Sequence, residues 1–441
     1  MEHELVIGLA GLACLIILIA LRIPIAFGMI MVGGIGVTAL NGPAIFLSQL
    51  KDLTYIQFSI YDLSVIPMFV LMGNLASRAG LSQELFRAAN AWLGWARGGV
   101  AMSAIVACAG FGAVCGSSLA TASTMGKVAL PELEKYKYQP SLATGTLAAG
   151  GGLGILIPPS VVLVIYAILV EANIVTMFMA AFVPGIIAVI LFLITIMIYV
   201  RVFPNSGPAR DRIGRDQFWQ ATFGVLPVLL IFGCVIGGIF FGVFNPTPAA
   251  AVGVFLVGGY AFIRGRMSML DLKFAGLDTA KTTGMIFLIL LGAEMLKIFM
   301  ARGGVPQALA EILGGSGLEP MMIMIFLLLG LIVLGCLMDS LSMILLAIPF
   351  FWPVIIDLDF GMNTEDLKIW FGILALIVVE LGLITPPVGM NVFVISAMAK
   401  NVPMATIFKG VTPFFASEIV RVILILMFPG LVLWLPSLLG G

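Results

Sequence analysis

The sequence has few charged residues and almost no histidine. Only 10% of its 441 residues are charged, whereas 61% are hydrophobic. Soluble domains average about 25% charged and about 45–50% apolar residues. This composition excludes a soluble core and places the chain in a lipid bilayer. The single histidine, His3, lies at the terminus, which argues against a histidine proton relay or a histidine-ligated metal. The 22 basic and 22 acidic residues form no basic tail or patch, so we expect no nucleic-acid partner.

The chain also lacks a Walker phosphate-binding loop, so ATP is not the expected energy source. An intramembrane enzyme would need a nucleophile–base pair or metal ligands at depth. Ser117 has no histidine partner, and we expect no enzyme. The five cysteines lie in apolar or glycine-rich surroundings without a pairing pattern, which favours buried small side chains over disulfides or metal ligands. These cysteines are Cys14, Cys108, Cys115, Cys234 and Cys336.

The first apolar run, Leu5–Leu21, has the length of either a signal peptide or a membrane span. Glu2 and Glu4 precede it, and no Lys or Arg does. A signal peptide needs a positively charged start. Because Arg22 follows the run instead, we interpret it as a first membrane helix whose N-terminus lies outside.

Further apolar stretches of about 17–25 residues predict additional spans. After Leu5–Leu21 they are Ile25–Leu40, Leu63–Ala76, Leu142–Val170, Ile174–Val200, Trp219–Phe241, Ala249–Ile263, Thr282–Met300, Ile369–Met398 and Val411–Leu433. Two other apolar blocks, Ala101–Leu130 and Met321–Ile356, each carry a glycine- and serine-rich interruption at the middle. We predict that these two blocks are re-entrant hairpins.

One motif occurs twice, as Leu153–Pro159 (LGILIPP) and Leu381–Pro387 (LGLITPP). Each copy lies inside a long apolar stretch. A Pro-Pro pair interrupts a helix there, because proline lacks an N–H and clashes with the preceding turn. Broken helices at matching positions in two halves are typical of secondary transporters, in which they mark the binding site.

Other residues match in the same register. Pro24 matches Pro248 and Gly80 matches Gly304, so the offset between halves stays at about 224 to 228 residues. Chance similarity between apolar segments is the alternative, but proline, glycine and glutamine positions agree together. By the charge count below, the span before Gly80 runs inward and the span before Gly304 runs outward. The sequence therefore predicts two repeats of opposite orientation.

Basic residues set the predicted orientation. The loops Arg201–Arg215 and Arg264–Lys273 are rich in arginine and lie two predicted spans apart, so they share one side. The positive-inside rule makes that side cytoplasmic. With the first hairpin not crossing the membrane, Arg22, Arg78 and Lys400 also lie inside. Both termini are then predicted to be extracytoplasmic.

These elements predict an all-α polytopic membrane protein with two mobile-core segments and an outer scaffold. The polar segments Gly80–Gly94 and Gly304–Gly315 each precede a hairpin and are predicted to lie along the interface. The predicted parts are residues 1–62 (scaffold of repeat 1), 63–173 (arm, hairpin 1 and broken helix), 174–216 (connecting helix and loop), 217–281 (scaffold of repeat 2), 282–409 (arm, hairpin 2 and broken helix) and 410–441 (C-terminal helix).

Chemistry is expected at the hairpin tips, Gly112–Thr121 and Gly335–Ser342, and at the two Pro-Pro breaks. Irregular backbone at membrane depth survives only where it is buried or lines a cavity. Half-helix C-termini, free carbonyls and hydroxyls suit Na⁺, whereas half-helix N-termini suit a carboxylate. For any single Ser, Thr or Gly here, ordinary helix packing is the alternative.

Ionisable residues within the spans are few. Asp339 is the only acid at a hairpin tip, and we expect it either to neutralise an ion or to cap the outgoing helix. Two i,i+3 pairs are expected to offset their charges on a helix face. These pairs are Glu294 with Lys297 and Glu418 with Arg421. Lys127 and Glu380 have no obvious local partner, and the roles of Lys127, Glu294, Lys297 and Glu380 stay open.

The segments Gly116–Ala122 (GSSLATA), Ile157–Ser160 (IPPS) and Thr385–Asn391 (TPPVGMN) resemble the large membrane subunit of TRAP transporters, and the similarity covers essentially the whole chain. The resemblance implies a Na⁺-coupled, elevator-type importer of organic acids. It also implies two partner proteins, namely a small four-helix membrane subunit and a soluble extracytoplasmic binding protein. In some members the small subunit is fused at the N-terminus. Because Leu5–Leu21 aligns with the first repeat, we expect no such fusion here.

The resemblance also implies a location in the cytoplasmic membrane of a bacterium or archaeon. It further implies two or more Na⁺ ions and the residues that bind them. Na⁺ site 1 comprises Ser117, Ser118, Gly152, Gly154 and Pro158. Na⁺ site 2 comprises Gly335, Asp339, Ser340, Thr385, Gly389 and Met390. Substrate is expected between the tips, near Ser117, Ser118, Thr121, Ser160 and Asn391. Some sialic-acid members carry an acid near the position of Thr121, so the hydroxyl here argues against that cargo.

Two related functions are the alternatives. One is a binding-protein-independent dicarboxylate/Na⁺ symporter or antiporter of the same superfamily. The other is a channel, which closed hairpins and inverted repeats disfavour. The sequence names neither the organic acid, nor the Na⁺ stoichiometry, nor the oligomeric state.

Overall fold

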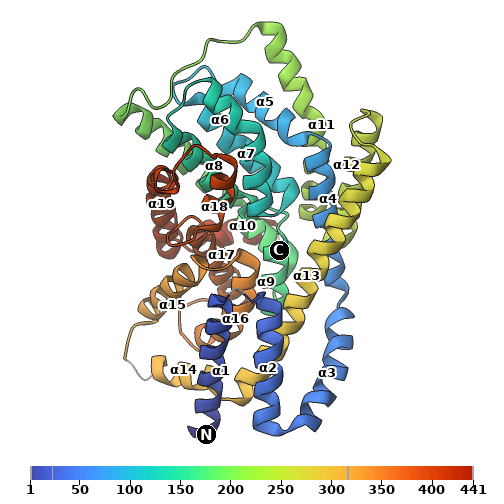
Figure 1. Ribbon diagram of the computed structural model, residues 1–441, viewed down its shortest axis with the longest axis vertical. Coiled ribbons are helices and arrows are strands. Elements are labelled where there is room, and N and C mark those ends of the chain that lie inside the picture. Colours follow the sequence, from blue (N-terminus) through green and yellow to red (C-terminus); the bar gives the residue numbers. More distant parts are fainter. Residues whose placement is uncertain (1, 22, 315–316, 440–441) are drawn as a thin grey trace.

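The computed structural model describes residues 2–21, 23–314 and 317–439, and helices are the only regular elements in these ranges. Two residues used in the sequence predictions, Arg22 and Gly315, lie outside them. Figure 1 shows an elongated bundle in which segments from both halves of the sequence meet at the centre. The all-α fold class predicted from composition is confirmed.

The first half comprises α1 (Glu2–Ala20), α2 (Ile25–Asn41), α3 (Pro43–Phe58), the 3-10 helix η1 (Tyr61–Ser64), α4 (Val65–Arg78), α5 (Leu81–Leu93), α6 (Gly99–Cys115), α7 (Ser118–Lys135), α8 (Pro140–Leu156), α9 (Val161–Leu169) and α10 (Ile174–Val202). The second half comprises α11 (Arg215–Phe240), α12 (Pro246–Ile263), α13 (Met269–Arg302), α14 (Val305–Gly314), α15 (Pro320–Gly335), α16 (Ser340–Ile356), α17 (Thr364–Gly382), α18 (Met390–Met398), α19 (Met404–Met427) and α20 (Gly430–Leu439).

Five helices in the described ranges, α10 to α13 and α19, are long and apolar enough to cross a membrane. Two bent pairs also qualify, namely α3 with η1–α4, bent by 62°, and α8 with α9, bent by 48°. The helix α3 is absent from the predicted spans, because Lys51 and Asp52 interrupt its apolar character. Several other predicted spans correspond to shorter apolar helices such as α1 and α2.

Both predicted hairpins fold as helix–turn–helix units. In hairpin 1, α6 packs against α7, and the turn passes through Gly116, whose φ of 63° suits glycine. In hairpin 2, α15 packs against α16. The Pro-Pro motifs separate α8 from α9 and α17 from α18, as the missing N–H groups require. The re-entrant character of the two units stays a prediction.

The polar segments that precede the hairpins form α5 and α14. Each follows a glycine in the left-handed region, Gly80 with φ 75° and Gly304 with φ 68°. These two glycines occupy matching positions in the two halves. In Figure 1, α5 lies towards the top and α14 towards the bottom, so the two helices lie at opposite ends of the long axis.

The two halves are cross-packed at the centre. Hairpin 1 packs against α8 of its own half and against α18 of the other half, through α7. Hairpin 2 packs against α17 of its own half and against α9 of the other half, through α16. Each broken helix therefore contributes one segment to each hairpin, which joins the four irregular segments into one unit.

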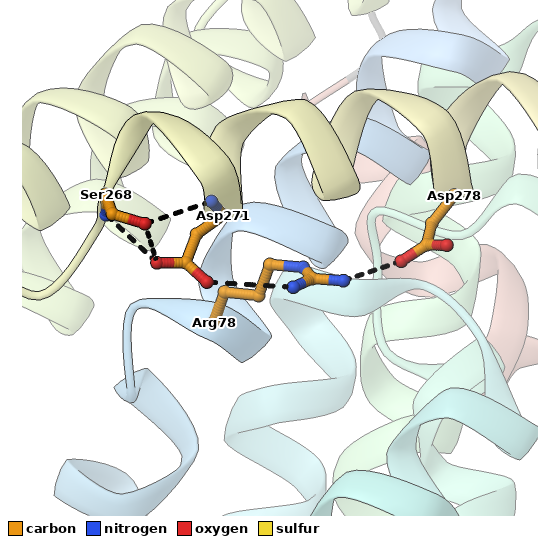
Figure 2. Close-up of polar contacts among 4 residues, drawn as sticks. All are labelled: Arg78, Ser268, Asp271 and Asp278. Atoms are coloured by element: carbon orange, nitrogen blue, oxygen red, sulfur yellow. Dashed lines mark hydrogen bonds and ion pairs between the residues drawn. The ribbon is translucent and has the colours of Figure 1, made fainter.

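A long helix, α13, lies beside α2 and α4 and joins the two ends of the molecule. Figure 2 shows its start, where the Arg78 guanidinium at the end of α4 lies 2.7 Å from Asp278 and 3.9 Å from Asp271. Asp271 and Ser268 form a capping box at the first turn. Because these groups are partly exposed, the pairs orient α4 on α13 more than they stabilise the fold.

Candidate functional site

A cavity of about 300 Å³ lies between the two hairpin tips. Ser117 and Ser118 line it from hairpin 1, and Asp339 and Ser340 line it from hairpin 2. Further lining comes from Ile155 of α8, from the first turn of α9 and from the arm helices α4 and α13. The tips are more than 200 residues apart in sequence, so the cavity exists only because the two halves are cross-packed.

Three helices begin at this cavity, namely α7, α9 and α16. Their capping side chains accept hydrogen bonds from the first-turn amides: Ser117 from Ala120 N at 3.5 Å and Ser160 from Leu163 N at 3.4 Å. Asp339 accepts from Ser342 N at 3.2 Å. Helix N-termini carry partial positive charge and unpaired N–H groups. Their convergence makes the cavity suitable for a small anion, although the Asp339 carboxylate opposes this on one side.

Hairpin 1 approaches α8 so closely that only glycine fits at the contact. A Cβ on Gly112 would lie 2.6 Å from Gly154 Cα. A Cβ on Gly154 would lie 2.6 Å from the Ser117 carbonyl oxygen and 2.4 Å from Thr121 Oγ1. Thr121 Oγ1 is buried and has no hydrogen-bond partner in the described chain. An unsatisfied oxygen beside a carbonyl is the kind of ligand that Na⁺ takes, so this contact fits site 1 of the sequence prediction.

The second break brings backbone oxygens together around one residue. Gly389 has φ 59°, and its Cβ position lies 3.3 Å from the Thr385 carbonyl and 3.4 Å from the Leu383 carbonyl. The Thr385 hydroxyl donates to the Leu381 carbonyl at 2.6 Å, and Met390 opens α18. Neutral oxygens therefore predominate at this break, which fits site 2 of the sequence prediction.

The tip serines each donate a hydrogen bond to the second broken helix. Ser118 Oγ donates to Asn391 Oδ1 at 3.4 Å, and Ser340 Oγ donates to Glu380 Oε1 at 3.0 Å. Glu380 Oε2 and Asn391 Nδ2 are buried without a hydrogen-bond partner among the described residues. A polar layer thus lies beneath the cavity, and it holds unsatisfied groups that a bound ligand would satisfy.

The predicted substrate residues divide into two layers. Ser117 and Ser118 line the cavity, whereas Thr121, Ser160 and Asn391 are fully buried beneath its wall. Among the site 2 residues, Asp339 and Ser340 line the cavity too. Gly335 instead packs against α17, where a Cβ on Gly382 would lie 2.6 Å from Gly335 Cα.

Near the first break, Gly152 lies against Glu380. A Cβ atom added at Gly152 would lie only 2.9 Å from Glu380 Oε2. Pro158 lies in the break and forms a cis bond to Pro159. The cavity also contains two polar side chains that the sequence prediction missed, Asn74 and Thr282. They lie in the arm helices α4 and α13. The only sequence signal that could have identified them is a polar residue within an apolar span.

Both predicted i,i+3 ion pairs are present. Lys297 Nζ lies 3.5 Å from Glu294 Oε1 on α13. Arg421 pairs with Glu418 on α19, and both are buried. Arg421 also donates to the Pro184 carbonyl at 3.4 Å, which ties α19 to α10. The additional hydrogen bond helps to offset the free-energy cost of burying the two charges.

No cluster of three or more His, Cys, Asp or Glu side chains able to hold a metal occurs among residues 2–21, 23–314 and 317–439. Any ion bound at the tips would therefore be held mainly by carbonyl and hydroxyl oxygens. This donor set suits a weakly held alkali cation better than a transition metal.

Comparison with known proteins gives a consistent result. Residues 12–431 match the family model described as the Tripartite ATP-independent periplasmic transporter, DctM component. The chain is 32% identical over 381 residues to the C4-dicarboxylate TRAP transporter large permease protein DctM of Pseudomonas aeruginosa, covering 86% of this chain and 87% of the relative. It is 30% identical over 386 residues to the sialic acid TRAP transporter large permease protein SiaM of Vibrio cholerae, covering 86% and 87%.

A solved structure shares the fold. The YdaH transporter of Alcanivorax borkumensis superposes with a TM-score of 0.60 at 13% sequence identity, covering 88% of this chain and 89% of that chain. At this identity the similarity concerns the fold alone. The relatives in sequence are transporter permeases, and they confirm that the chain is a multi-pass membrane transporter component and not an enzyme. The resemblance drawn from the tip and break motifs is likewise confirmed, and the chain belongs to the DctM family of tripartite ATP-independent periplasmic transporters.

Proposed function

We propose that the protein is the large subunit of a Na⁺-coupled importer that carries a small organic acid across the cytoplasmic membrane. The observation that carries this proposal is the cavity between the two hairpin tips, at which three helices begin. The positive ends of α7, α9 and α16 would attract a carboxylate. The hydroxyls of Ser117, Ser118 and Ser340 would orient it.

The substrate class follows from the cavity and from the relatives. A volume of about 300 Å³ suits a small ligand. No Lys or Arg lines the cavity in the described part of the chain, so helix ends must supply the attraction for an anion. Relatives are named for a C4-dicarboxylate and for sialic acid, both of which are carboxylates. These observations support a carboxylate without selecting one.

Na⁺ would be co-transported at the two contacts between a tip and a break. Site 1 would use the Ser117 carbonyl and the unsatisfied Thr121 hydroxyl near Gly154. Site 2 would use the carbonyls around Gly389, with Asp339 supplying negative charge nearby. Ions at both contacts would fix the tips and reduce repulsion between Asp339 and the substrate. Coupling follows by linkage, since ion and substrate would each raise the affinity for the other.

Movement would follow an elevator mechanism, in which a core moves relative to a scaffold. The hairpins and broken helices are cross-packed and would travel as one body. The interfacial helices α5 and α14, each preceded by a glycine with positive φ, would allow the movement at opposite ends. The partners would be a small four-helix membrane subunit and an extracytoplasmic binding protein. Both termini would lie outside, as the basic loops predict.

Uptake by reconstituted proteoliposomes tests the ion sites. We expect Ser117→Ala and Thr385→Ala to raise the Na⁺ concentration needed for half-maximal uptake. Thr412→Ala is a matched control for Thr385, because Thr412 also donates to the carbonyl four residues earlier, at 3.0 Å. Ser268→Ala is a matched control for Ser117, because Ser268 also caps a helix. Wild-type uptake by both site variants at limiting Na⁺ would exclude this site assignment.

Dependence on partners distinguishes the proposal from a symporter or antiporter that works without a binding protein. We expect uptake only when the small subunit and the binding protein are both present. Uptake by the isolated chain at the rate of the full assembly would favour the alternative.

A further inference from the structure

A second cavity, of about 440 Å³, lies far from the hairpin tips, at the end of the molecule that carries the basic loops. It is formed by α5, the end of α7, the loop that precedes α11, and the first turns of α11. Three basic side chains line it, Arg87, Lys135 and Arg210, against a single carboxylate, Glu132. The cavity is therefore electropositive and belongs to neither the substrate site nor the Na⁺ sites.

The loop that carries Arg210 is held in place by specific hydrogen bonds. Gly98 N donates to the Gly207 carbonyl at 3.0 Å, and Gln139 N donates to the Ser206 carbonyl at 2.9 Å. The Tyr138 hydroxyl donates to the Pro208 carbonyl at 3.2 Å. Burial raises the pKa of Tyr138 to about 12, so this hydroxyl stays protonated and continues to donate. The loop is thus fixed to the base of hairpin 1.

This anchoring positions the loop arginines before any ligand binds. The Arg210 guanidinium lies 5.2 Å from the centre of the Tyr136 ring. The Arg212 guanidinium lies 4.7 Å from the centre of the Trp95 ring, next to an adjoining cavity of about 320 Å³. Stacking on aromatic faces leaves the N–H groups at the guanidinium edge free to donate.

Two of the positive charges have no opposite charge to offset them. Lys135 pairs with Glu132 at 3.2 Å. Arg87 and Arg210 have no carboxylate within ion-pair distance among the described residues. Asn90 lines both cavities and is buried, with 8% of its surface exposed, and its Oδ1 has no hydrogen-bond partner in the described chain. The site therefore offers the guanidinium donors of Arg87 and Arg210 to an anion, and the Asn90 Oδ1 acceptor to a hydroxyl group.

Tryptophans place the cavity at the level of lipid headgroups. Trp92 and Trp95 line the adjoining cavity, and Trp219 packs against Phe218, which lines that cavity too. All three tryptophans are substantially exposed. Trp92 Nε1 donates to Thr222 on α11 at 3.0 Å, so this ring is fixed at the edge of the site. Exposed tryptophans mark the membrane–water interface. Next along α11, Phe223 is 63% exposed, as expected of a side chain facing acyl chains.

We propose that this cavity binds the headgroup of an anionic phospholipid, whose phosphate is held by Arg87 and Arg210. The acyl chains would lie along the exposed apolar face of α11, and the glycerol headgroup would reach Asn90. Basic pockets of this kind between helices are typical of binding sites for anionic lipids. Since α5, α7 and α11 all contribute, a bound lipid would also tie hairpin 1 to α11.

The test uses purified, delipidated protein and measures lipid retention by native mass spectrometry. The probes are phosphatidylglycerol and phosphatidylcholine, which share a phosphodiester but differ in net charge. We expect the wild-type protein to prefer phosphatidylglycerol. Arg210→Gln should lower that preference about fivefold, and Arg87→Gln combined with it should lower it further. Arg264→Gln, in another basic loop and also stacked on a tyrosine, is the matched control and should retain the preference.

Thermal unfolding in each lipid gives an independent readout. Phosphatidylglycerol should raise the midpoint for the wild-type protein and for Arg264→Gln, but less for Arg210→Gln. Equal lipid preference in wild-type protein and the double variant would overturn the proposal. Displacement of phosphatidylglycerol by millimolar inorganic phosphate would also overturn it, because the site would then belong to a soluble anion.

Discussion

The two hairpin tips occupy matching positions but differ in chemistry. Each reaches the broken helix of its own half through a pair of glycines, Gly112 with Gly154 and Gly335 with Gly382. The capping residue of the outgoing helix is a serine in hairpin 1 and Asp339 in hairpin 2. Backbone contact is therefore common to both halves, whereas charge is concentrated in the second.

The same difference appears two residues before the broken-helix glycine of each contact. Glu380 in α17 corresponds in the repeat to Gly152 in α8. A Cβ atom added at Gly152 would lie 2.9 Å from Glu380 Oε2. One half thus provides a carboxylate and the other provides the space for it. These two matching segments are therefore complementary and not equivalent.

The outer surfaces of the hairpins differ as well. Nearly every residue of α6 is buried, whereas α15 exposes Leu329 and Val333. Hairpin 1 is enclosed by α5, α8 and α10, whereas α15 of hairpin 2 packs mainly against α16 and α17. We therefore expect the two tips to depend on close packing to the same extent and on polar contacts to different extents.

The largest effect is expected from a methyl group at a glycine contact. In Gly154→Ala the new methyl would lie 2.4 Å from Thr121 Oγ1, and in Gly382→Ala it would lie 2.6 Å from Gly335 Cα. Each should lower the free energy of unfolding by about 3 kcal/mol and abolish uptake. Thermal unfolding measures the first quantity. Gly233→Ala is the control, because nothing lies within 4 Å of its Cβ position. A well-tolerated Gly154→Ala would contradict the tight contact at tip 1.

The next largest effect should come from the contact between Ser340 and Glu380. Glu380→Ala removes the acceptor of the 3.0 Å hydrogen bond and leaves a space beside Gly152. We expect a loss of about 2 kcal/mol in the free energy of unfolding. A double-mutant cycle with Ser340→Ala should give a coupling energy of about 1 kcal/mol. The longer contact from Ser118 to Asn391, at 3.4 Å, should couple more weakly. The reverse order would mean that tip 1 holds the stronger polar contact.

A smaller effect is expected at the helix caps. Ser117→Ala removes the cap of α7 and should lower the free energy of unfolding by about 1 kcal/mol. Asp339→Asn keeps a capping oxygen on α16 and should cost only a few tenths of a kcal/mol. If Asp339→Asn is the more damaging change, the Asp339 charge matters to folding and the caps are not comparable.

The smallest effect should come from the partly exposed ion pairs of Figure 2, which lie away from both tips. Arg78→Gln removes both contacts to α13 and should cost about 0.5 kcal/mol at low salt. High salt should reduce this difference, because exposed charges are screened. Unfolding measured at two ionic strengths tests this. A loss that persists at high salt would show that Arg78 contributes through packing.

The sequence predicted the hairpins and breaks because each has a local signal. The interruptions at Gly116 and Asp339 and the two Pro-Pro pairs force irregular backbone wherever they occur. The ion pair of Glu418 with Arg421 was also predictable, since i,i+3 geometry needs only a helix. The partner of Glu380 was not predictable, because Ser340 lies 40 residues away and approaches it only after hairpin 2 folds.

Two further differences have physical causes. The sequence criterion of an uninterrupted apolar run missed α3, whose Lys51 and Asp52 are tolerated at an exposed surface. Thr121 and Asn391 were predicted beside the substrate but lie beneath the cavity wall. A residue that is close in sequence to a hairpin tip is expected to lie near the site. Its position in the sequence does not show whether its side chain faces the site or the opposite side of the helix.

The length of α13 has one more consequence. Its 34 residues amount to a rod of about 51 Å, which reaches from the arginine-rich end of the molecule to α14. Near its far end, Phe299 sits in notches left by Gly11 and Gly36, and the backbone at Met295 rests on Gly33. Sliding of α13 along α1 and α2 would force Phe299 and Met295 out of these contacts, so we expect the three helices to keep their relative positions.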